Sequence, residues 1–271
     1  MSTPIGNLGD ITLRALEVLR GVDFVLAEDT RQTRVLLDRY EITTPMLPLH
    51  AHNEARTIPR VLERLGSGEA GALVSDAGTP VLSDPGERLV RAVWTGGFRV
   101  APVPGPSALL AALAAAGVDA ARFTFFGFLP RSGRERQAAL HELSEARWTG
   151  VLYEAPGRVS RTLSELDAAG LGDREIVVAR ELTKRFEEFR RGTAAELAAY
   201  YAASPPRGEV VVILQGRTEV PVDETAIEEQ AAELRARGVP AREIATLLVR
   251  EHGVARNLAY RLAHGTGASR A

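Results

Sequence analysis

The chain has 271 residues, of which 45% are hydrophobic and 25% charged, and its net charge is -2 at pH 7. This length suffices for two compact domains, and the near-neutral charge gives no whole-chain signature of nucleic-acid binding. The sequence contains no cysteine, which excludes disulfides and cysteine-ligated metal sites. No signal peptide is recognisable, and the longest small-apolar stretch, residues 108–117, is too short to span a membrane. We therefore expect a cytoplasmic enzyme without a membrane partner.

Strand-like and helical segments alternate over the first 116 residues, which predicts an α/β fold with a mainly parallel sheet. Asp10 is placed to cap a helix that runs to Arg20. Further helices are expected at residues 32–40, 53–65, 87–94 and 108–116. Strands are expected at residues 24–27, 70–74 and 98–103.

The pattern changes near Gly117, after which a second α/β domain is expected. Its strands are predicted at residues 123–128, 150–154, 175–179 and 209–214. Its helices are predicted to end at residue 146 and to cover residues 159–169 and 194–203. Residues 1–118 would then form an N-terminal domain and residues 119–216 a second domain that completes a ligand cleft between them.

Residues 217–271 differ in composition from the rest. Residues 217–233 hold six acidic residues and one arginine, which predicts an acidic linker, whereas residues 234–271 carry a local balance of +5. Two short apolar-periodic segments, residues 240–252 and 254–263, meet at Gly253 and predict a helical hairpin similar to a helix-turn-helix. Contact with nucleic acid and packing on the body or on a partner subunit are equally compatible with this pattern.

Three proline–glycine loops follow expected strands, at residues 4–6, 78–80 and 104–107. Glycine lets a backbone approach a ligand closely, and proline fixes the shape of a loop in advance. In open α/β sheets, ligands bind outside the carboxyl ends of the strands. No G-x-G-x-x-G or P-loop pattern is present, so neither a nicotinamide cofactor nor a nucleoside triphosphate is indicated. The loops suit a compact ligand with a sugar, an amino acid group and a ring.

A single lysine, Lys184, stands among 33 basic residues. Lysine can lose its proton when buried and then serve as a base. Asp29 and Arg31 lie at another strand end, where two interpretations stay open: a helix cap with a solvated arginine, or a site that binds an anion such as phosphate. His50 and His52 lack a third clear ligand, so no metal site is expected.

Seven motifs are similar, in sequence and in order, to a known family. They lie at residues 3–12, 27–31, 49–54, 74–80, 83–86, 102–107 and 180–184. Together they resemble the small-subunit ribosomal RNA methyltransferases of the tetrapyrrole methylase superfamily, over nearly the whole chain. The resemblance implies a two-domain tetrapyrrole-methylase-like fold and a homodimer. It also implies S-adenosylmethionine as methyl donor and, as acceptor, the ribose 2'-hydroxyl of a cytidine in 16S ribosomal RNA near the decoding centre.

The resemblance also implies roles for individual residues. The donor is expected to contact, largely through backbone groups, Ile5, Gly6, Ser75, Asp76, Gly78, Thr79, Leu82, Ser107, Ala108, Tyr153, Glu154, Gly208 and Glu209. Independently of the resemblance, the lone lysine at a strand end leads us to expect Lys184, neutral in the cleft, as the base for the ribose proton, with Asp29 as the rival. RNA is expected to contact Arg31, Arg180, Arg131, Arg134 and Arg136, either free or within the small ribosomal subunit.

The chain departs from the family pattern in two places. Relatives usually carry several apolar residues ahead of the motif at residues 3–12, where this chain has only Met1 and Ser2. Either the start is misassigned or that strand is dispensable. Gly157 replaces a common histidine, which argues against an essential role there. A tetrapyrrole precursor methyltransferase and a non-catalytic RNA-binding assembly factor are the alternatives to an RNA methyltransferase.

Overall fold

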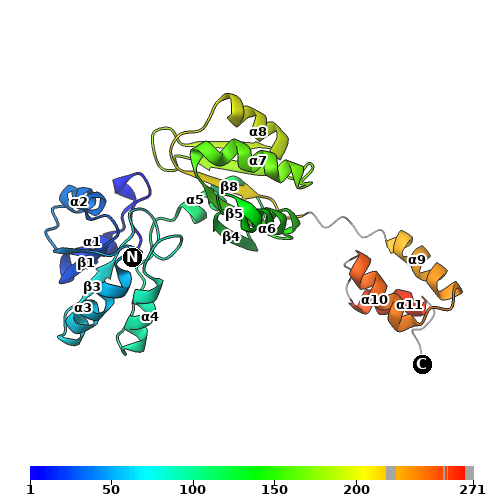
Figure 1. The fold of residues 1–271 in the computed structure, drawn as a ribbon, viewed down its shortest axis with the longest axis horizontal. Coiled ribbons are helices and arrows are strands. Elements are labelled where there is room, and N and C mark those ends of the chain that lie inside the picture. The colour runs from blue at the N-terminus through cyan, green and yellow to red at the C-terminus, as the bar shows by residue number, and fades with distance from the viewer. Residues whose placement is uncertain (218–223, 253, 255, 266–271) are drawn as a thin grey trace. The chain divides into compact units, whose positions relative to one another are not determined.

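The computed structural model describes residues 1–217, 224–252, 254 and 256–265. The chain divides into two compact units, Met1–Arg217 and Thr218–Ala271. The first unit contains two separate sheets with helices packed on them (Figure 1). The α/β class expected from the alternating pattern is confirmed.

The first sheet is parallel and has the strand order β2-β1-β3. Its strands are β1 (Phe24–Ala27), β2 (Met46–Pro48) and β3 (Gly71–Leu73). One face packs on helices α1 (Leu13–Gly21) and α2 (Thr30–Arg39). The other face packs on helices α3 (Glu54–Gly66) and α4 (Glu87–Thr95). Successive strand residues point to opposite faces, so Val25 and Leu26 belong to different cores.

The second sheet is mixed and has the strand order β4-β5-β8-β6-β7. Only β4 and β5 are parallel, and the remaining pairs are antiparallel. The strands are β4 (Phe123–Phe128), β5 (Thr149–Glu154), β6 (Ile176–Arg180), β7 (Glu188–Gly192) and β8 (Val210–Leu214). The mainly parallel arrangement expected for the first part of the sequence therefore holds for the first sheet, whereas the second α/β domain has a mostly antiparallel sheet.

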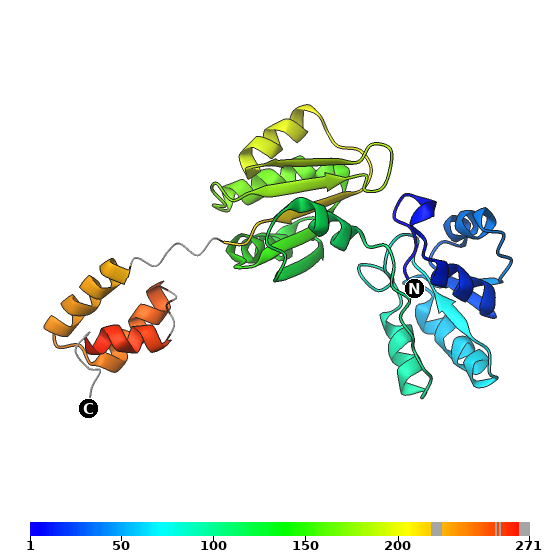
Figure 2. The ribbon, with the colours of Figure 1, turned by 180° about the vertical axis from the view of Figure 1, so that it is seen from behind.

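Helices cover both faces of the second sheet, as two views show (Figures 1 and 2). Leu152, Val178 and Val212 face a core shared with α6 (Gly133–Glu145), α7 (Val159–Ala168) and α8 (Ala194–Ala203). The alternate positions face α5 (Ala108–Ala116), together with Ile5 and Leu182. The first loop and α5 therefore share a core with the second sheet.

Two local expectations for the first sheet are wrong. Thr12, not Asp10, caps α1, because its hydroxyl accepts a hydrogen bond from the Ala15 N–H at 3.1 Å, whereas Asp10 lies in a 3-10 helix (Leu8–Asp10). Residues 98–103 form no strand, because β3 pairs only with β1 among the strands of the described chain. Two short strands, β2 and β7, were not expected, because neither carries a strong apolar pattern.

The second unit contains three helices in its described residues: α9 (Glu224–Ala236), α10 (Ala241–His252) and α11 (Arg256–His264). Their buried side chains form one core, with Ile227, Ile244 and Leu262 among them. The expected C-terminal helices are confirmed, whereas the acidic segment expected as a linker includes α9. Gly253, the expected break, lies outside the described residues. None of the described helices has the length and apolar character needed to cross a bilayer.

Candidate functional site

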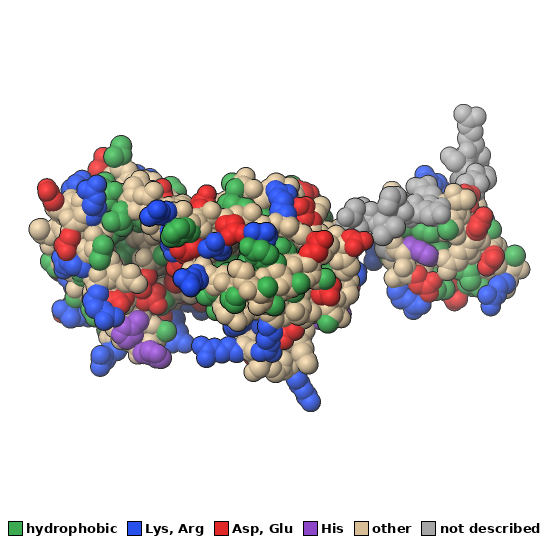
Figure 3. All heavy atoms as spheres, turned by 90° about the horizontal axis from the view of Figure 1, so that it is seen from above, with side chains coloured by type: hydrophobic (Ala, Val, Ile, Leu, Met, Phe, Trp, Pro, Cys, Tyr) green, Lys and Arg blue, Asp and Glu red, His purple; other side chains and the backbone are tan. Residues whose placement is uncertain are grey.

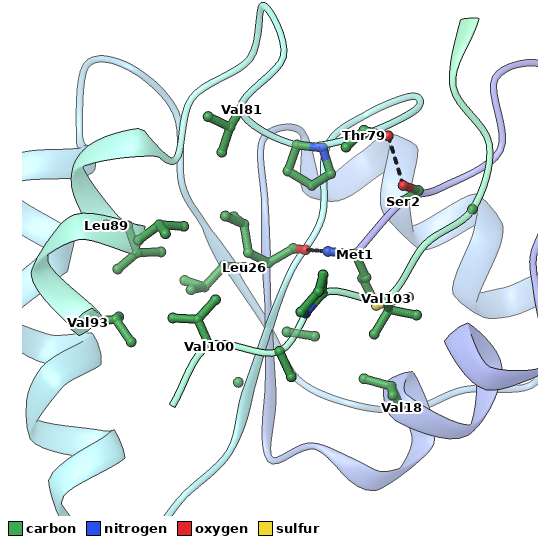
Figure 4. Close-up of a pocket in the computed structure, with 18 of the residues that line it drawn as sticks. Met1, Ser2, Val18, Leu26, Thr79, Val81, Leu89, Val93, Val100 and Val103 are labelled. Carbon is green, nitrogen blue, oxygen red and sulfur yellow. Dashed lines mark hydrogen bonds between the residues drawn. The ribbon is translucent and has the colours of Figure 1, made fainter. Parts of the chain in front are cut away.

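The three proline–glycine loops meet at one edge of the first sheet. Thr3 and Gly78 exchange two backbone hydrogen bonds, at 2.9 and 3.0 Å. The hydroxyls of Ser2 and Thr79 lie 2.9 Å apart, as Figure 4 shows, and the Thr79 hydroxyl donates to the Pro106 carbonyl at 3.4 Å. Segments far apart in sequence are thus tied into one cradle, which we name the loop junction (residues 2–6, 75–80 and 104–107).

The middle loop is held tightly by its own residues. Ser75 is 3% exposed, and its hydroxyl donates to the Gly78 carbonyl at 3.1 Å. The Thr3 hydroxyl donates to the Ser75 carbonyl at 3.0 Å. Gly78 has φ of +79°, a left-handed conformation that glycine adopts without strain. A bulkier residue at Gly78 would disturb both the turn and its contact with Ile5.

Lys184 reaches this junction from the second sheet. A Cβ added to Gly6 would stand 2.5 Å from Lys184 Cγ and 2.7 Å from Lys184 Cε. Such distances are not tolerated, so only glycine fits at position 6 while Lys184 holds this place. The structure therefore brings together Gly6 and the lone lysine, which the sequence motifs placed in the same ligand site.

Two carboxylates bind the Lys184 ammonium group. Lys184 Nζ donates to Glu181 Oε1 at 2.9 Å and to Glu209 Oε2 at 3.1 Å. Burial alone lowers the pKa of Lys184, but the hydrogen bonds to Glu181 and Glu209 outweigh burial and raise the pKa above its ordinary value. Both hydrogen bonds favour the protonated form of Lys184, so this arrangement does not support a neutral lysine.

Gly208 makes the arrangement of these carboxylates possible. Its φ is +80°, and a Cβ there would lie 1.8 Å from Glu181 Oε1. Glu181 itself has φ of 52°, an uncommon conformation for a residue with a side chain. The expected site residues Gly208 and Glu209 thus lie beside Lys184.

Asp29 is the N-cap of α2, as one of the two sequence interpretations held. Its carboxylate accepts from the Arg31 backbone N–H at 2.9 Å and forms an ion pair with the Arg31 guanidinium at 2.7 Å. These interactions lower the pKa of Asp29 to about 2, so it is a weak base. The Asp29 N–H donates to Asp76 Oδ1 at 2.8 Å, which ties this turn to the middle loop.

Asp84 is a candidate that the sequence reasoning did not single out. Burial, followed by the nearby charges of Glu28 and Asp76, raises the pKa of Asp84 to about 6. Val81 and Ser83 precede it with φ of 76° and 69°, so this turn is strained. The signal available in the sequence was a second aspartate in the same loop, at residues 83–86.

The other residues expected to contact the methyl donor divide into two groups. Tyr153 and Ser107 lie at the start of α5: the Tyr153 hydroxyl accepts from the Leu109 N–H at 3.2 Å, and Ser107 is the N-cap. Burial raises the pKa of Tyr153. The Glu154 side chain is instead fully buried and pairs with Arg158 at 2.9 Å, so only its backbone is left for a ligand. Among the outer positions, Leu82 is exposed and Ala108 is half-buried.

The arginines expected to contact RNA differ in availability. Arg136 is 2% exposed and bonds to Glu165 at 2.7 Å, so it stabilises the fold. Arg180 pairs with Glu188 at 2.7 Å. Arg31 pairs with Asp29, but its side chain is exposed to solvent. Arg131 and Arg134 are also exposed. On the face shown in Figure 3, basic and acidic side chains are interspersed, without a broad patch of one sign.

Comparison with known proteins shows which family the chain belongs to. Residues 2–198 match the family of Tetrapyrrole (Corrin/Porphyrin) Methylases. "Ribosomal RNA small subunit methyltransferase I" of Synechocystis sp. is 42% identical over 97% of this chain and 95% of its own. The protein of the same name from Xylella fastidiosa is 49% identical over 81% of each chain. The chain therefore belongs to the ribosomal RNA small subunit methyltransferase I family of the tetrapyrrole methylases.

Solved structures agree on the fold. Diphthine synthase has a TM-score of 0.61 at 16% identity, covering 78% of this chain and 87% of its own. Uroporphyrin-III C-methyl transferase from Thermus thermophilus, complexed with S-adenyl homocysteine, has a TM-score of 0.55 at 20% identity, covering 78% and 93%. At these identities the likeness establishes the fold alone, and the tetrapyrrole methylase fold is confirmed.

Proposed function

We propose that the chain is a methyltransferase that takes its methyl group from S-adenosylmethionine and transfers it to ribosomal RNA. The names of the relatives and the S-adenyl homocysteine bound by a protein of the same fold support this. The observation that carries the proposal is the junction of three glycine- and proline-rich loops, closed by Lys184 against Gly6.

The residues of this region fit such a donor. Gly6, Gly78 and Gly208 leave backbone exposed where a side chain would fill the space or strain the turn. The hydroxyl of Thr183, next to Lys184, is buried and has no hydrogen-bond partner among the described residues. A polar group in that state is costly unless a ligand or water satisfies it.

Within this proposal, the donor contacts follow the sequence motifs. Ile5, Gly6 and Gly78 would hold it through backbone groups, and Gly208 and Glu209 would bound it from the second sheet. The remaining proposed contacts are Ser75, Asp76, Thr79, Leu82, Ser107, Ala108, Tyr153 and the Glu154 backbone.

The proposed acceptor is the 2'-hydroxyl of a cytidine in 16S ribosomal RNA near the decoding centre. The exposed Arg31, Arg131 and Arg134 favour a polyanion over a small macrocycle, since arginine pairs well with phosphate. Residues 234–271 add a local charge balance of +5. We also infer that the protein is a cytoplasmic homodimer, as the resemblance implies for the dimer. Light scattering of the purified protein measures the mass of the particle in solution and so tests the dimer.

S-adenosylmethionine supplies a methyl group that is already activated on a positively charged sulfur. The loops would hold the acceptor oxygen in line with it, and such alignment contributes about 7–11 kcal/mol. A general base contributes about 10²–10⁴-fold more. The protonated Lys184 and the weakly basic Asp29 are both poor proton acceptors. We therefore assign the ribose proton to Asp84 and give Lys184 the role of holding Gly6 and the two carboxylates in place.

Methyl-labelled donor tests this function directly. Purified protein is offered isolated small ribosomal subunits, free 16S ribosomal RNA and a tetrapyrrole precursor in separate reactions. Label recovered as 2'-O-methylcytidine by mass spectrometry of RNA digests supports the proposal. Label on a base refutes the 2'-hydroxyl assignment, and label on the tetrapyrrole alone refutes the RNA substrate. Donor binding without transfer to any acceptor would favour a non-catalytic assembly factor.

A further inference from the structure

Phe128, the last residue of β4, carries a large apolar ring that is 56% exposed. β4 is an edge strand of the second sheet, at one end of the strand order (Figure 1). Exposure alone is common for a single apolar side chain and needs no explanation. The backbone around Phe128, however, directs and fixes this ring in a way that ordinary surface residues do not need.

A β-bulge in β4 sets the direction of the ring. Phe125 pairs with Val151 in β5. The following pair joins Phe128 to Tyr153, so β4 has two residues between these pairs where β5 has one. Strand residues alternate between the two faces of a sheet, and the extra residue reverses this alternation. The rings of Phe125 and Phe128 therefore both contact the Tyr153 ring, at centroid distances of 4.9 and 5.6 Å.

The neighbours of Phe128 hold the ring in place. Tyr153 meets it edge-on, with an angle of 61° between the ring planes. The Tyr153 hydroxyl is itself held by the Leu109 N–H at 3.2 Å. Gly127, immediately before Phe128, has φ of +60°, which glycine adopts without strain. The ring is thus accessible and already ordered, which lowers the entropy cost of binding a flat partner.

The same bulge lies against the turn that leads to Asp84. A Cβ added to Gly127 would stand 3.3 Å from Ser83 Oγ, in the strained turn just before Asp84. Burial raises the pKa of Tyr153, and the charges of Asp84 and Glu209 raise it further, so both carboxylates lie within electrostatic reach of this tyrosine. An aromatic surface therefore borders the group to which we assign the ribose proton.

We propose that the base of the acceptor nucleotide stacks on the ring of Phe128, an inference that rests on the proposed transfer of a methyl group to RNA. Stacking there would hold the ribose of the same nucleotide near Asp84. Sites for single-stranded RNA combine aromatic rings, on which bases stack, with basic side chains that bind the backbone. Arg131 and Arg134 follow Phe128 closely in the chain and are exposed, so neighbouring phosphates have partners there. The site would select a nucleotide that is free of its own helical stack.

Two substitutions at Phe128 separate stacking from apolar packing. Phe128→Leu keeps an apolar side chain but removes the flat ring, and it is expected to weaken binding of isolated small ribosomal subunits about tenfold. Phe128→Tyr keeps the ring and should bind like the parent. Phe123→Leu is the matched control, since Phe123 is an exposed ring at the other end of the same strand. Equal affinities for the subunits in Phe128→Leu and Phe123→Leu would overturn the proposal.

Donor affinity, measured by titration calorimetry, should be the same in the parent and in these variants. This readout shows that Tyr153 and the loop junction are undisturbed. A loss of donor affinity in Phe128→Leu that equals its loss of subunit affinity would overturn the proposal, because the ring would then support the donor site instead of the base.

Photocross-linking locates the base without any methyl transfer. A short single-stranded oligocytidylate with one 5-iodocytidine is mixed with the protein and irradiated, and the linked residue is identified by mass spectrometry. A link to Phe128 is expected, and links only to other residues, or none, would overturn the proposal. A link to Phe128 in a protein that methylates no RNA would refute the proposed function and keep the stacking site. Methylation of RNA without such a link would do the reverse.

Discussion

The backbone of Gly6 lies directly against the aliphatic stem of Lys184, close enough that a Cβ on Gly6 would stand 2.5 Å from Lys184 Cγ. This contact joins the first loop of the chain to the strand end that carries its only lysine. It couples the loop that we propose to bind the donor to the cluster of Lys184, Glu181 and Glu209. Disturbing either partner should therefore affect donor binding.

Gly6→Ala is expected to weaken donor binding about tenfold or more, because the new methyl group must displace Lys184 or the loop. Titration calorimetry with S-adenosylmethionine measures the change. Gly157→Ala is the control, since an added Cβ there meets nothing within 4 Å. Equal affinities in the two variants would show that the Gly6 contact is not part of the donor site.

Lys184→Arg is expected to keep most single-turnover methylation, because arginine retains the charge that holds Glu181 and Glu209. Lys184→Met removes that charge and should lower both donor affinity and the free energy of unfolding, the latter by about 1 kcal/mol. Rapid-quench kinetics and denaturant titration give the two readouts. Loss of methylation in Lys184→Arg with donor binding intact would restore lysine as the proton acceptor.

Gly208→Ala is expected to lower the free energy of unfolding by more than Gly170→Ala does. Both glycines have positive φ, +80° and +84°, so both variants carry the same kind of backbone strain. Only at Gly208 would the Cβ also collide with Glu181, whereas at Gly170 nothing lies within 4 Å. The difference, about 1–3 kcal/mol by denaturant titration, measures the collision. Equal losses would mean that Glu181 moves aside freely.

Asp84 predicts a particular pH dependence. Methylation needs its charged form, so the rate should rise with pH through about 6. Asp84→Asn should slow single-turnover methylation about 100-fold and abolish the rise of the rate near pH 6, while donor affinity is retained. Asp38→Asn, an exposed carboxylate on α2, is the control. If the rate of the Asp84→Asn variant still rises near pH 6, another group is responsible for that pH dependence.

For stability, the raised pKa of Asp84 predicts the opposite pH dependence: the folded state loses stability as the pH rises. The pKa of Asp84 is raised in the folded chain, so the folded state binds this proton more tightly than the unfolded state. Its stabilising contribution is complete below the unfolded pKa of 3.8 and is lost as the pH rises through about 6. Asp84→Asn should therefore be more stable than the parent at pH 7, with little difference at pH 4. Thermal melts at the two pH values measure this.

The arginines should separate into two kinds. Replacing Arg131 and Arg134 by alanine should weaken RNA binding and lower the slope of log affinity against log salt by about 0.7–0.9 per lost contact, while stability stays unchanged. Arg136→Met should instead cost about 2 kcal/mol of stability, because Glu165 loses its buried partner. Fluorescence anisotropy over a salt series and denaturant titration distinguish these outcomes. An unchanged slope in the double variant would remove these arginines from the RNA surface.

Local patterns in the sequence were sufficient for much of this protein. The sequence pattern predicted the helices α3, α4, α5 and α8. In α3 and α4 the apolar residues recur on one face, and α5 is rich in alanine, the residue most favourable to helix. The glycines and prolines at residues 4–6, 78–80 and 104–107 marked the loops that meet, because their backbone requirements are local. Seven motifs in the same order as in the family were sufficient to predict the family.

Only the tertiary structure decided what depends on distant neighbours. The direction of β6 and β8 follows from pairing, which alternation of strands and helices does not encode. Residues 98–103 have a strand-like pattern but form no strand, since a strand needs an adjacent edge to bond with. The charge of Lys184 could not be predicted from the sequence for the same reason. Its pKa depends on Glu181 and Glu209, and Glu209 comes from another strand and reaches it only after folding.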